Sequence, residues 1–232
     1  RFTFHVSRFT FHVSRFTYSM IRLRITFSKT RAMRFSGHLD LHRAWERTIR
    51  RAELPLAYTE GFHPHPRIQL GAALPLGFTS DCELADIWLA MEAAPDSLAE
   101  ARARLDAAVP PGIRIRAIAP VDLREPPLQM QIVAADFQVT WLDSPPGDLS
   151  ARAVALLAQP ALTRTRREKA YDLRPLIESL SVAAAEPPTL NMTLAAREGA
   201  TGRPEEVLLA LGLDPAAAQI HRTALRLQPA AA

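Results

Sequence analysis

Residues 21–28 read IRLRITFS, and this short stretch decides the fold. Apolar residues alternate there with polar or charged ones, and this period of two is typical of a β-strand with one face in the core. The residues that follow predict a helix at 38–53, strands at 68–70 and 84–91, a helix that starts at 95–96, and a strand at 113–118. The order is therefore β-α-β-β-α-β, which is that of the split, ferredoxin-like unit.

The predicted helix at 38–53 follows from the spacing of its apolar residues. They recur on one side of a helix, while charged residues occupy the other side. Ser36 precedes the helix at a position from which its hydroxyl could cap free backbone N–H groups. The predicted core stripe consists of Leu41, Trp45, Thr48, Ile49 and Ala52.

A second half of similar plan is expected after a linker at 122–130, where Pro126 and Pro127 interrupt regular structure. Its predicted elements are a strand at 132–141, a helix at 148–157, extended segments at 162–166, 176–182 and 190–195, a helix that starts at Pro204, and a strand at 220–227. We therefore expect an α+β protein with two ferredoxin-like halves, 20–121 and 131–232. They should pack together, with antiparallel sheets and helices on one face.

Residues 1–19 contain a perfect heptapeptide repeat, RFTFHVS, begun a third time ahead of Met20. We expect this leader to be disordered or to result from a mis-set start, since it lacks the long apolar run of a signal peptide or membrane span. It holds three arginines and no acidic residue, so only +1 of the formal net charge of +4 belongs to the remaining residues. The overall basicity of the chain is therefore no argument for nucleic-acid binding.

Charge is distributed unevenly along the rest of the chain. Residues 20–67 hold ten Lys or Arg against four Asp or Glu, whereas residues 68–163 hold six against twelve. A basic end followed by an acidic middle predicts a directional electrostatic field. The counts fit RNA, a phosphate and an acidic protein equally well as partners.

Cys82 is the only cysteine in the sequence. An internal disulfide is therefore excluded, and a reducing, cytoplasmic environment is expected. An iron–sulfur radical enzyme needs three closely spaced cysteines of its own. This chain is consequently not such an enzyme, and we expect it to carry no cofactor.

Four arginines of the predicted helix, Arg43, Arg47, Arg50 and Arg51, gather on the side opposite the core stripe. Guanidinium groups present a planar fork of donors that can grip phosphates. The alternative is a solvated helix face on which Asp40–Arg43 and Glu46–Arg50 pairs contribute a few tenths of a kcal/mol each.

The loop at 55–67 reads PLAYTEGFHPHPR and combines three prolines, one glycine and two histidines. The proline after each histidine favours an extended backbone, so that His63 and His65 share a face at a spacing that could chelate a metal. A catalytic zinc site would need a third ligand, from His38 or Asp40. His65 or His38 could instead serve in acid–base chemistry on RNA. A further alternative is that the loop is only a stiff exposed connection.

The loop also suits single-stranded RNA, because aromatic rings and imidazoles beside arginines can stack on bases and contact phosphates. The residues predicted to bind are Lys29, Arg43, Arg47, Arg50, Arg51, Tyr58, Phe62, His63, His65 and Arg67, with His38, Asp40 and His65 as possible catalytic residues.

Several ordered segments of the chain resemble a bacterial family of unknown function whose members are encoded beside, or fused to, radical SAM proteins. The resemblance extends from Met20 to about Leu227. The segments that carry it are 35–41, 45–47, 50–51, 54–58, 61–68, 74–77, 172–177 and 203–206.

The resemblance implies a radical SAM protein as partner and an accessory role in RNA or ribosome maturation, because such genes often lie near those for a ribonuclease and ribosomal proteins. We therefore expect a cytoplasmic accessory protein that holds RNA, or a ribosome-related substrate, in a basic groove between its halves, with no membrane association. The alternatives are a metal- or histidine-dependent hydrolase or RNA endonuclease, and a protein–protein adaptor that binds no nucleic acid.

Overall fold

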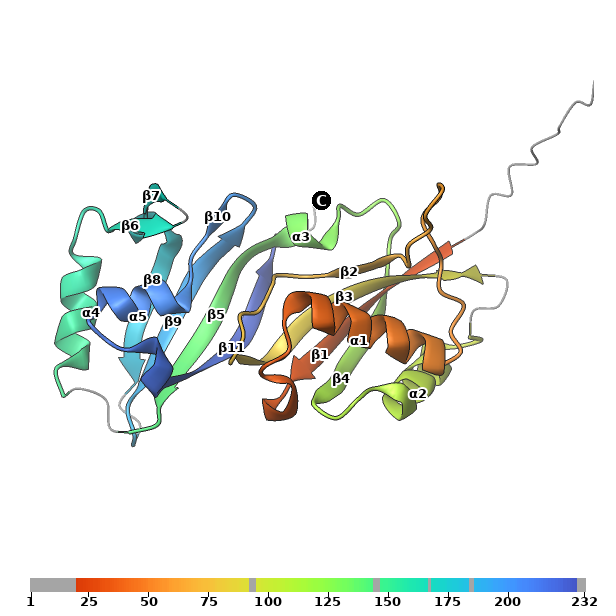
Figure 1. Cartoon of the computed structure of the whole chain (residues 1–232), viewed down its shortest axis with the longest axis horizontal. Coiled ribbons are helices and arrows are strands. Elements are labelled where there is room, and N and C mark those ends of the chain that lie inside the picture. The colour runs from red at the N-terminus through yellow and green to blue at the C-terminus, as the bar shows by residue number, and fades with distance from the viewer. Residues whose placement is uncertain (1–19, 92–94, 144–146, 167, 184–185, 229–232) are drawn as a thin grey trace, which may run out of the picture.

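The fold is described from a computed structural model, which covers residues 20–91, 95–143, 147–166, 168–183 and 186–228. The predicted leader at 1–19 lies outside these residues. The described part is a mixed α+β fold with eleven strands and five α-helices (Figure 1). Among the described residues, no helix combines the length and the apolar character needed to cross a membrane.

The N-terminal half places four strands in the order β4-β1-β3-β2, and each neighbouring pair is antiparallel. The helices α1 and α2 follow β1 and β3 in the chain. The elements are β1 (Met20–Lys29), α1 (His38–Arg51), β2 (Ile68–Leu70), β3 (Thr79–Ala90), α2 (Leu98–Ala108) and β4 (Ile113–Val121).

The C-terminal half places its main strands in the order β11-β5-β9-β8, again antiparallel, with β10 as a short partner of β9. The hairpin of β6 and β7 stands apart from this sheet. The elements are α3 (Leu128–Gln131), β5 (Ile132–Trp141), α4 (Leu149–Leu157), β6 (Thr163–Arg166), β7 (Lys169–Asp172), β8 (Ile177–Ala183), β9 (Thr189–Arg197), β10 (Ala200–Thr201), α5 (Pro204–Ala210) and β11 (Ala218–Leu227).

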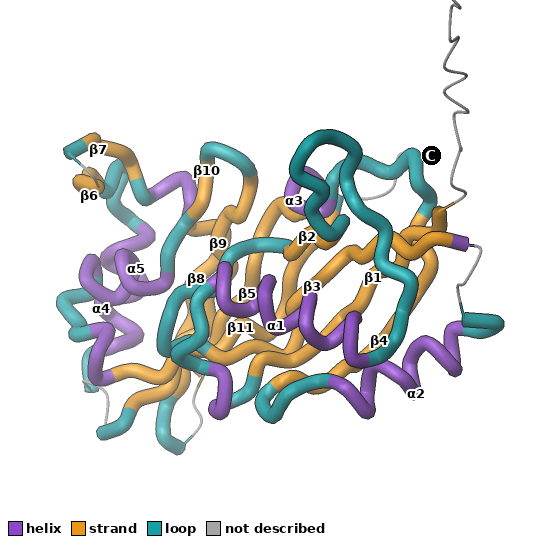
Figure 2. The backbone as a smooth tube through the Cα atoms, turned by 45° about the vertical axis from the view of Figure 1, so that its right-hand side comes forward, coloured by secondary structure: helices purple, strands orange, loops and turns teal. Residues whose placement is uncertain are grey.

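The two halves share one nine-stranded sheet, because β11 pairs in parallel with the beginning of β3. The pairing involves His221 beside Thr79 and Arg222 beside Ser80. The predicted α+β class is confirmed, and the expectation of separate sheets is wrong. Figure 2 shows the strands other than β6 and β7 as one continuous layer, with α1 in front of it.

The apolar alternation in β1 is confirmed, because Leu23, Ile25 and Phe27 are buried. They pack with the predicted stripe of α1, all five residues of which are buried, and the Phe27 and Trp45 ring centroids lie 4.9 Å apart. A second core lies between α4, α5 and the strands of the C-terminal half. Ser36 does not cap α1, because the N-cap residue is Gly37, one position later. Asp40 Oδ2 accepts a hydrogen bond from Gly37 N at 3.2 Å.

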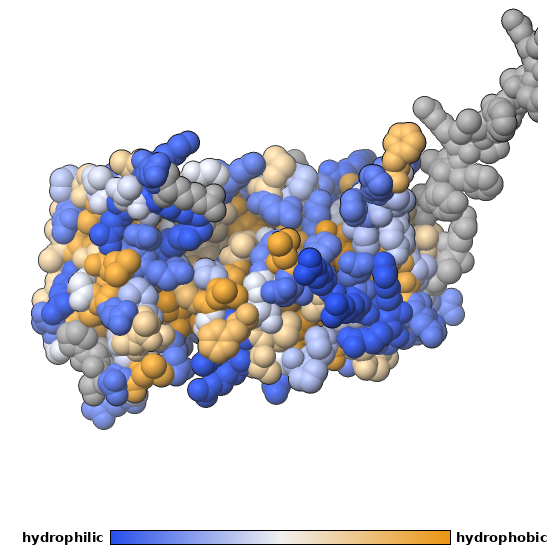
Figure 3. Space-filling model, viewed as in Figure 1, coloured by the Kyte–Doolittle hydropathy of each residue, from blue (hydrophilic) through white to orange (hydrophobic). Residues whose placement is uncertain are grey.

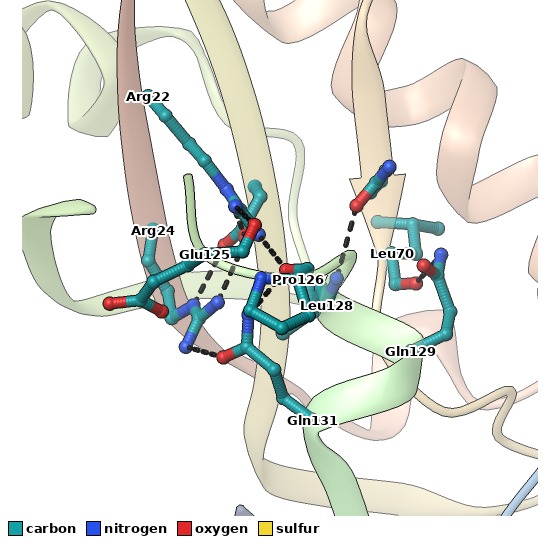
Figure 4. A network of polar contacts seen from close by, with 10 residues as sticks. Arg22, Arg24, Leu70, Glu125, Pro126, Leu128, Gln129 and Gln131 are labelled. Carbon is teal, nitrogen blue, oxygen red and sulfur yellow. Dashed lines mark hydrogen bonds and ion pairs between the residues drawn. The ribbon is translucent and has the colours of Figure 1, made fainter. Parts of the chain in front are cut away.

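The opposite face of β1 is not solvated. Arg22 and Asp86 are both buried there, and Arg22 Nη2 lies 2.6 Å from Asp86 Oδ2. Arg22 also donates to the carbonyls of Glu125 and Pro126, at 2.8 and 3.0 Å (Figure 4). The predicted linker at 122–130 is therefore held against the sheet, and its last residues belong to α3.

Candidate nucleic-acid interface

The four arginines predicted on one side of α1 are all exposed. Arg50 pairs with Glu46 at 2.8 Å, and Arg51 donates to the carbonyl of Ala108 at 2.7 Å. Within the described residues, Arg43 and Arg47 form no ion pair and no side-chain hydrogen bond. Figure 3 shows the most hydrophilic residues gathered over α1.

The predicted Asp40–Arg43 pair is absent from the ion pairs of the described residues, because Asp40 instead caps the helix. The predicted Glu46–Arg50 pair is present. The face of α1 is thus partly neutralised at Arg50, whereas Arg43 and Arg47 keep two free guanidinium groups one helical turn apart. We call the exposed surface of Arg43, Arg47, Arg50 and Arg51 the basic face.

The loop after α1 is a pinned hairpin rather than a loose connection. Thr59 N donates to His65 O at 2.8 Å, and His65 N donates to Thr59 Oγ1 at 2.9 Å. The base of the hairpin is fixed to β3, because Ala57 N donates to Trp88 O at 2.8 Å. At its turn, Gly61 has a φ of 124°, which L side chains rarely adopt.

The tip of this hairpin presents aromatic and imidazole groups to solvent. Phe62 is fully exposed and Tyr58 is 46% exposed, and both His63 and His65 are exposed as well. An apolar ring held in water by a hydrogen-bonded hairpin contributes nothing to the core. It is therefore available for contact with another molecule.

Two residues predicted to bind serve the fold instead. Lys29 is only 1% exposed, and its Nζ donates to the carbonyl oxygen of Ser36 at 2.9 Å. Burial lowers the pKa of Lys29. Arg67 is half-buried and lies over the ring of Trp88, 5.1 Å from its centroid. Lys29 was predicted to bind together with the exposed arginines, but its burial separates it from their surface.

The possible catalytic residues do not come together. His38 and Asp40 begin α1, whereas His63 and His65 belong to the hairpin that follows its far end, and a helix of this length spans about 20 Å. No cluster of three or more His, Cys, Asp or Glu within the described residues could hold a metal ion. Desolvation, followed by the nearby His42, lowers the pKa of His38.

A cleft of about 760 Å³ lies between the two halves. The sequence predicted a basic groove there but not the residues that line it. Its lining comes from the segment after β2, from the first strand of the C-terminal half, and from the β9–β10 turn. The arginines that line it are Arg166, Arg197, Arg203 and Arg222. None of them belongs to the predicted binding set. Arg166 lies in a second basic stretch, TRTRREK at 163–169, whereas the other three are separated from one another in the sequence.

Arg222 joins the two halves at the base of this cleft. It is 3% exposed, and its Nη1 donates to Glu83 Oε1 at 2.8 Å and to the carbonyl of Ala72 at 3.0 Å. Its Nη2 donates to the carbonyl of Ala73 at 2.9 Å. Arg222 is therefore fixed in position by the N-terminal half although it belongs to β11.

The comparisons identify a family without describing an activity. The model of a family described as "Uncharacterized protein conserved in bacteria (DUF2344)" matches residues 22–204. No curated protein matches the chain. A crystal structure of an unknown protein from Galdieria sulphuraria aligns with 91% of this chain and 100% of its own, at 11% identity and a TM-score of 0.26.

Proposed function

We propose that this chain, which belongs to the uncharacterized family conserved in bacteria (DUF2344), is a non-catalytic RNA-binding accessory protein. The observation that carries the proposal is the coincidence of two unpaired arginines on α1 with a fully exposed aromatic ring on the adjacent hairpin. Guanidinium groups would contact phosphates, and the rings of Phe62 and Tyr58 would stack on unpaired bases.

The hairpin favours single-stranded over double-stranded RNA as the ligand. Its rings stand free of the core, and stacking on them requires bases that are not already stacked in a helix. Stacking is also tolerant of sequence, because every base has a π-face. The separation of His38 and Asp40 from the hairpin histidines gives no support to a hydrolase.

A radical SAM enzyme is the partner to which we propose the RNA is presented. The family description names no partner, so this part of the proposal rests on the resemblance in the sequence. Co-purification of the chain with such an enzyme, in an RNA-dependent manner, would support it. Co-purification that persists after ribonuclease treatment would instead favour the protein–protein adaptor.

We also propose that each half derives from the ferredoxin-like unit. The orders β4-β1-β3-β2 and β11-β5-β9-β8 place β1 and β3, and likewise β5 and β9, in the middle of each half. In sequence α1 and α4 lie between these middle strands, and α2 and α5 follow them. Such order is expected of a split β-α-β unit. Independent folding of 131–232 would support the inference that this half is a complete unit.

The basic face is tested by measuring the affinity for a labelled single-stranded RNA as salt is varied. Each phosphate contact to a single strand contributes about 0.7 to the slope of log K against log salt. Because the slope is negative, Arg47→Ala should make it less steep by about that amount. The matched control is Arg124→Ala, which removes an exposed arginine that pairs with the nearby Asp122.

The hairpin is tested by Phe62→Ala. The change should weaken RNA binding by about 1–3 kcal/mol while leaving the salt slope unchanged, because stacking involves no counterion release. The fold should be unaffected, since the ring makes no contribution to either core. Absence of RNA binding by the unaltered chain at low salt would refute the proposed function.

A further inference from the structure

The cleft between the halves opens over β5, beside α3 and the first residue of α5. In Figure 1, β5 and β11 are visible between α5 and α1, and the surface in Figure 3 is hollowed in this region. Its volume of about 760 Å³ is within the range of sites that enclose small organic ligands. It is distinct from the basic face, none of whose arginines line it.

The floor of the cleft is built from small and apolar residues, which leave room for a flat group. Ala135, Ala195 and Gly202 are buried there, so no long side chain projects from these positions. Ile132 and Phe137 complete the apolar floor. A planar ring system could lie on this surface and remove apolar area from water.

Positive charge surrounds this floor. Arg166 and Arg197 are exposed and Arg203 is half-buried, and none of the three forms an ion pair or side-chain hydrogen bond with another described residue. Glu198 is the one acidic residue among those lining the cleft in the described part of the chain. Three arginines against one glutamate leave an excess of positive charge that an anion would neutralise.

Arg222 also has a buried donor without a partner. Its Nε forms no hydrogen bond with another described residue, whereas Nη1 donates two hydrogen bonds and Nη2 one. An unpaired buried donor costs free energy of about 1–3 kcal/mol.

We propose that this cleft binds a nucleoside phosphate. The phosphate would be held by Arg197 and Arg203, and the base would lie over the small residues of the floor. Gln129 Nε2 already donates to the carbonyl of Leu70, which leaves its amide oxygen as an acceptor for a base edge. Thr201 donates to the carbonyl of Arg197 and likewise keeps its oxygen free to accept.

An anion that carries an acyl chain, such as a fatty acid, fits this arrangement less well than a nucleotide. The cleft offers acceptors as well as cations, and a base carries donor groups on its edge whereas an acyl chain has none. The nucleotide could be free, or it could be the phosphorylated end of an RNA held on the basic face. The second form rests on the proposed function, whereas the first does not.

The test uses the full chain with three probes: adenosine 5′-monophosphate, inorganic phosphate, and a short RNA with or without a 5′-phosphate. Binding is measured by calorimetry at low salt. Ala73→Trp fills the cleft from an exposed position, with Ala103→Trp on α2 as the control of equal size. Arg197→Ala/Arg203→Ala removes the charges, with Arg124→Ala as the charge control.

The monophosphate should bind more tightly than inorganic phosphate, and both cleft variants should weaken it by about tenfold or more while the controls do not. A free nucleotide as ligand predicts similar affinity for the monophosphate and the phosphorylated RNA. An RNA end predicts tighter binding of the RNA, dependent on its 5′-phosphate.

Failure of this inference is separable from failure of the proposed function. Arg47→Ala should weaken RNA and leave the monophosphate unaffected, because the basic face lies outside the cleft. If neither the monophosphate nor the phosphorylated RNA depends on the cleft residues, the inference is overturned even when RNA still binds through α1. Circular dichroism of each variant shows that it is folded.

Discussion

Replacement of Asp86 by alanine should destabilise the fold more than replacement of any surface carboxylate. The side chain of Asp86 is fully buried, and it accepts from Arg22 and from Arg24, with Arg24 Nε at 2.8 Å from Oδ1. The pKa of Arg24 is raised, mainly because its side chain is hydrogen-bonded to Asp86. Removal of Asp86 leaves the buried Arg22 with two backbone carbonyls and the ring of Trp88, but with no carboxylate among the described residues.

The size of the effect follows from burial. Loss of one partner of a buried ion pair costs about 3–5 kcal/mol, because the remaining charge stays out of water. For a chain of this length each kcal/mol lowers Tm by about 2–4 °C, so Asp86→Ala should lower Tm by about 6–20 °C. Thermal and urea unfolding followed by circular dichroism measure both quantities.

Asp81→Ala is the matched control. Asp81 is exposed and pairs with Arg116 at 2.9 Å, so its loss should cost no more than about 1 kcal/mol. Replacement of the whole group by apolar residues, as in Arg22→Met/Arg24→Met/Asp86→Leu, should be less damaging than Asp86→Ala, because no charge is left unpaired. Equal Tm shifts for Asp86→Ala and Asp81→Ala would refute the reasoning.

Three further predictions concern the fold and its titrating groups. Gly112→Ala should lower the free energy of unfolding by about 1–3 kcal/mol, as measured in urea, because Gly112 has a φ of 99° and an added Cβ would lie 2.5 Å from Met33 Cγ. Gly147→Ala is the control, since a Cβ there would have nothing within 4 Å. Burial raises the pKa of Cys82 to about 11, so iodoacetamide at pH 8 should alkylate the native thiol about a hundredfold more slowly than the unfolded one, and equal rates would contradict this. Because desolvation lowers the pKa of His38, the unfolded chain takes up this proton first as pH falls below about 6.5, and stability should drop there; His38→Gln should reduce the drop, and an unchanged pH profile would count against it.

The local elements could be predicted from the sequence because their signals are local. The alternation in 21–28 and the helical spacing from Leu41 to Ala52 each depend on burial of one face, and the structure buries those residues. The far face of β1 could not be foreseen in the same way. The alternation places Arg22 on the face of β1 opposite the core. That face is buried only because residues far along the chain, Glu125 and Pro126, lie against it.

The candidate site likewise has parts that could be predicted from one short segment and parts that depend on segments far apart in the sequence. The basic face and the exposed hairpin are each contained in one short segment, so their composition was visible in the sequence. Lys29 lies in the same basic stretch, 20–67, but it ends β1 and is buried, with its Nζ hydrogen-bonded to the carbonyl of Ser36. The cleft depends on the pairing of β11 with β3, which brings Arg222 to Glu83 across 139 positions of sequence.

The salt dependence of single-stranded RNA binding by Arg43→Ala/Arg47→Ala tests the central claim most directly. Both side chains are exposed and unpaired within the described residues, so their loss should leave the fold intact. The account predicts that the slope of log K against log salt, which is negative, becomes less steep by about 1.4 in the double variant, while Arg124→Ala changes it little. An unchanged slope and affinity in the double variant would contradict the account.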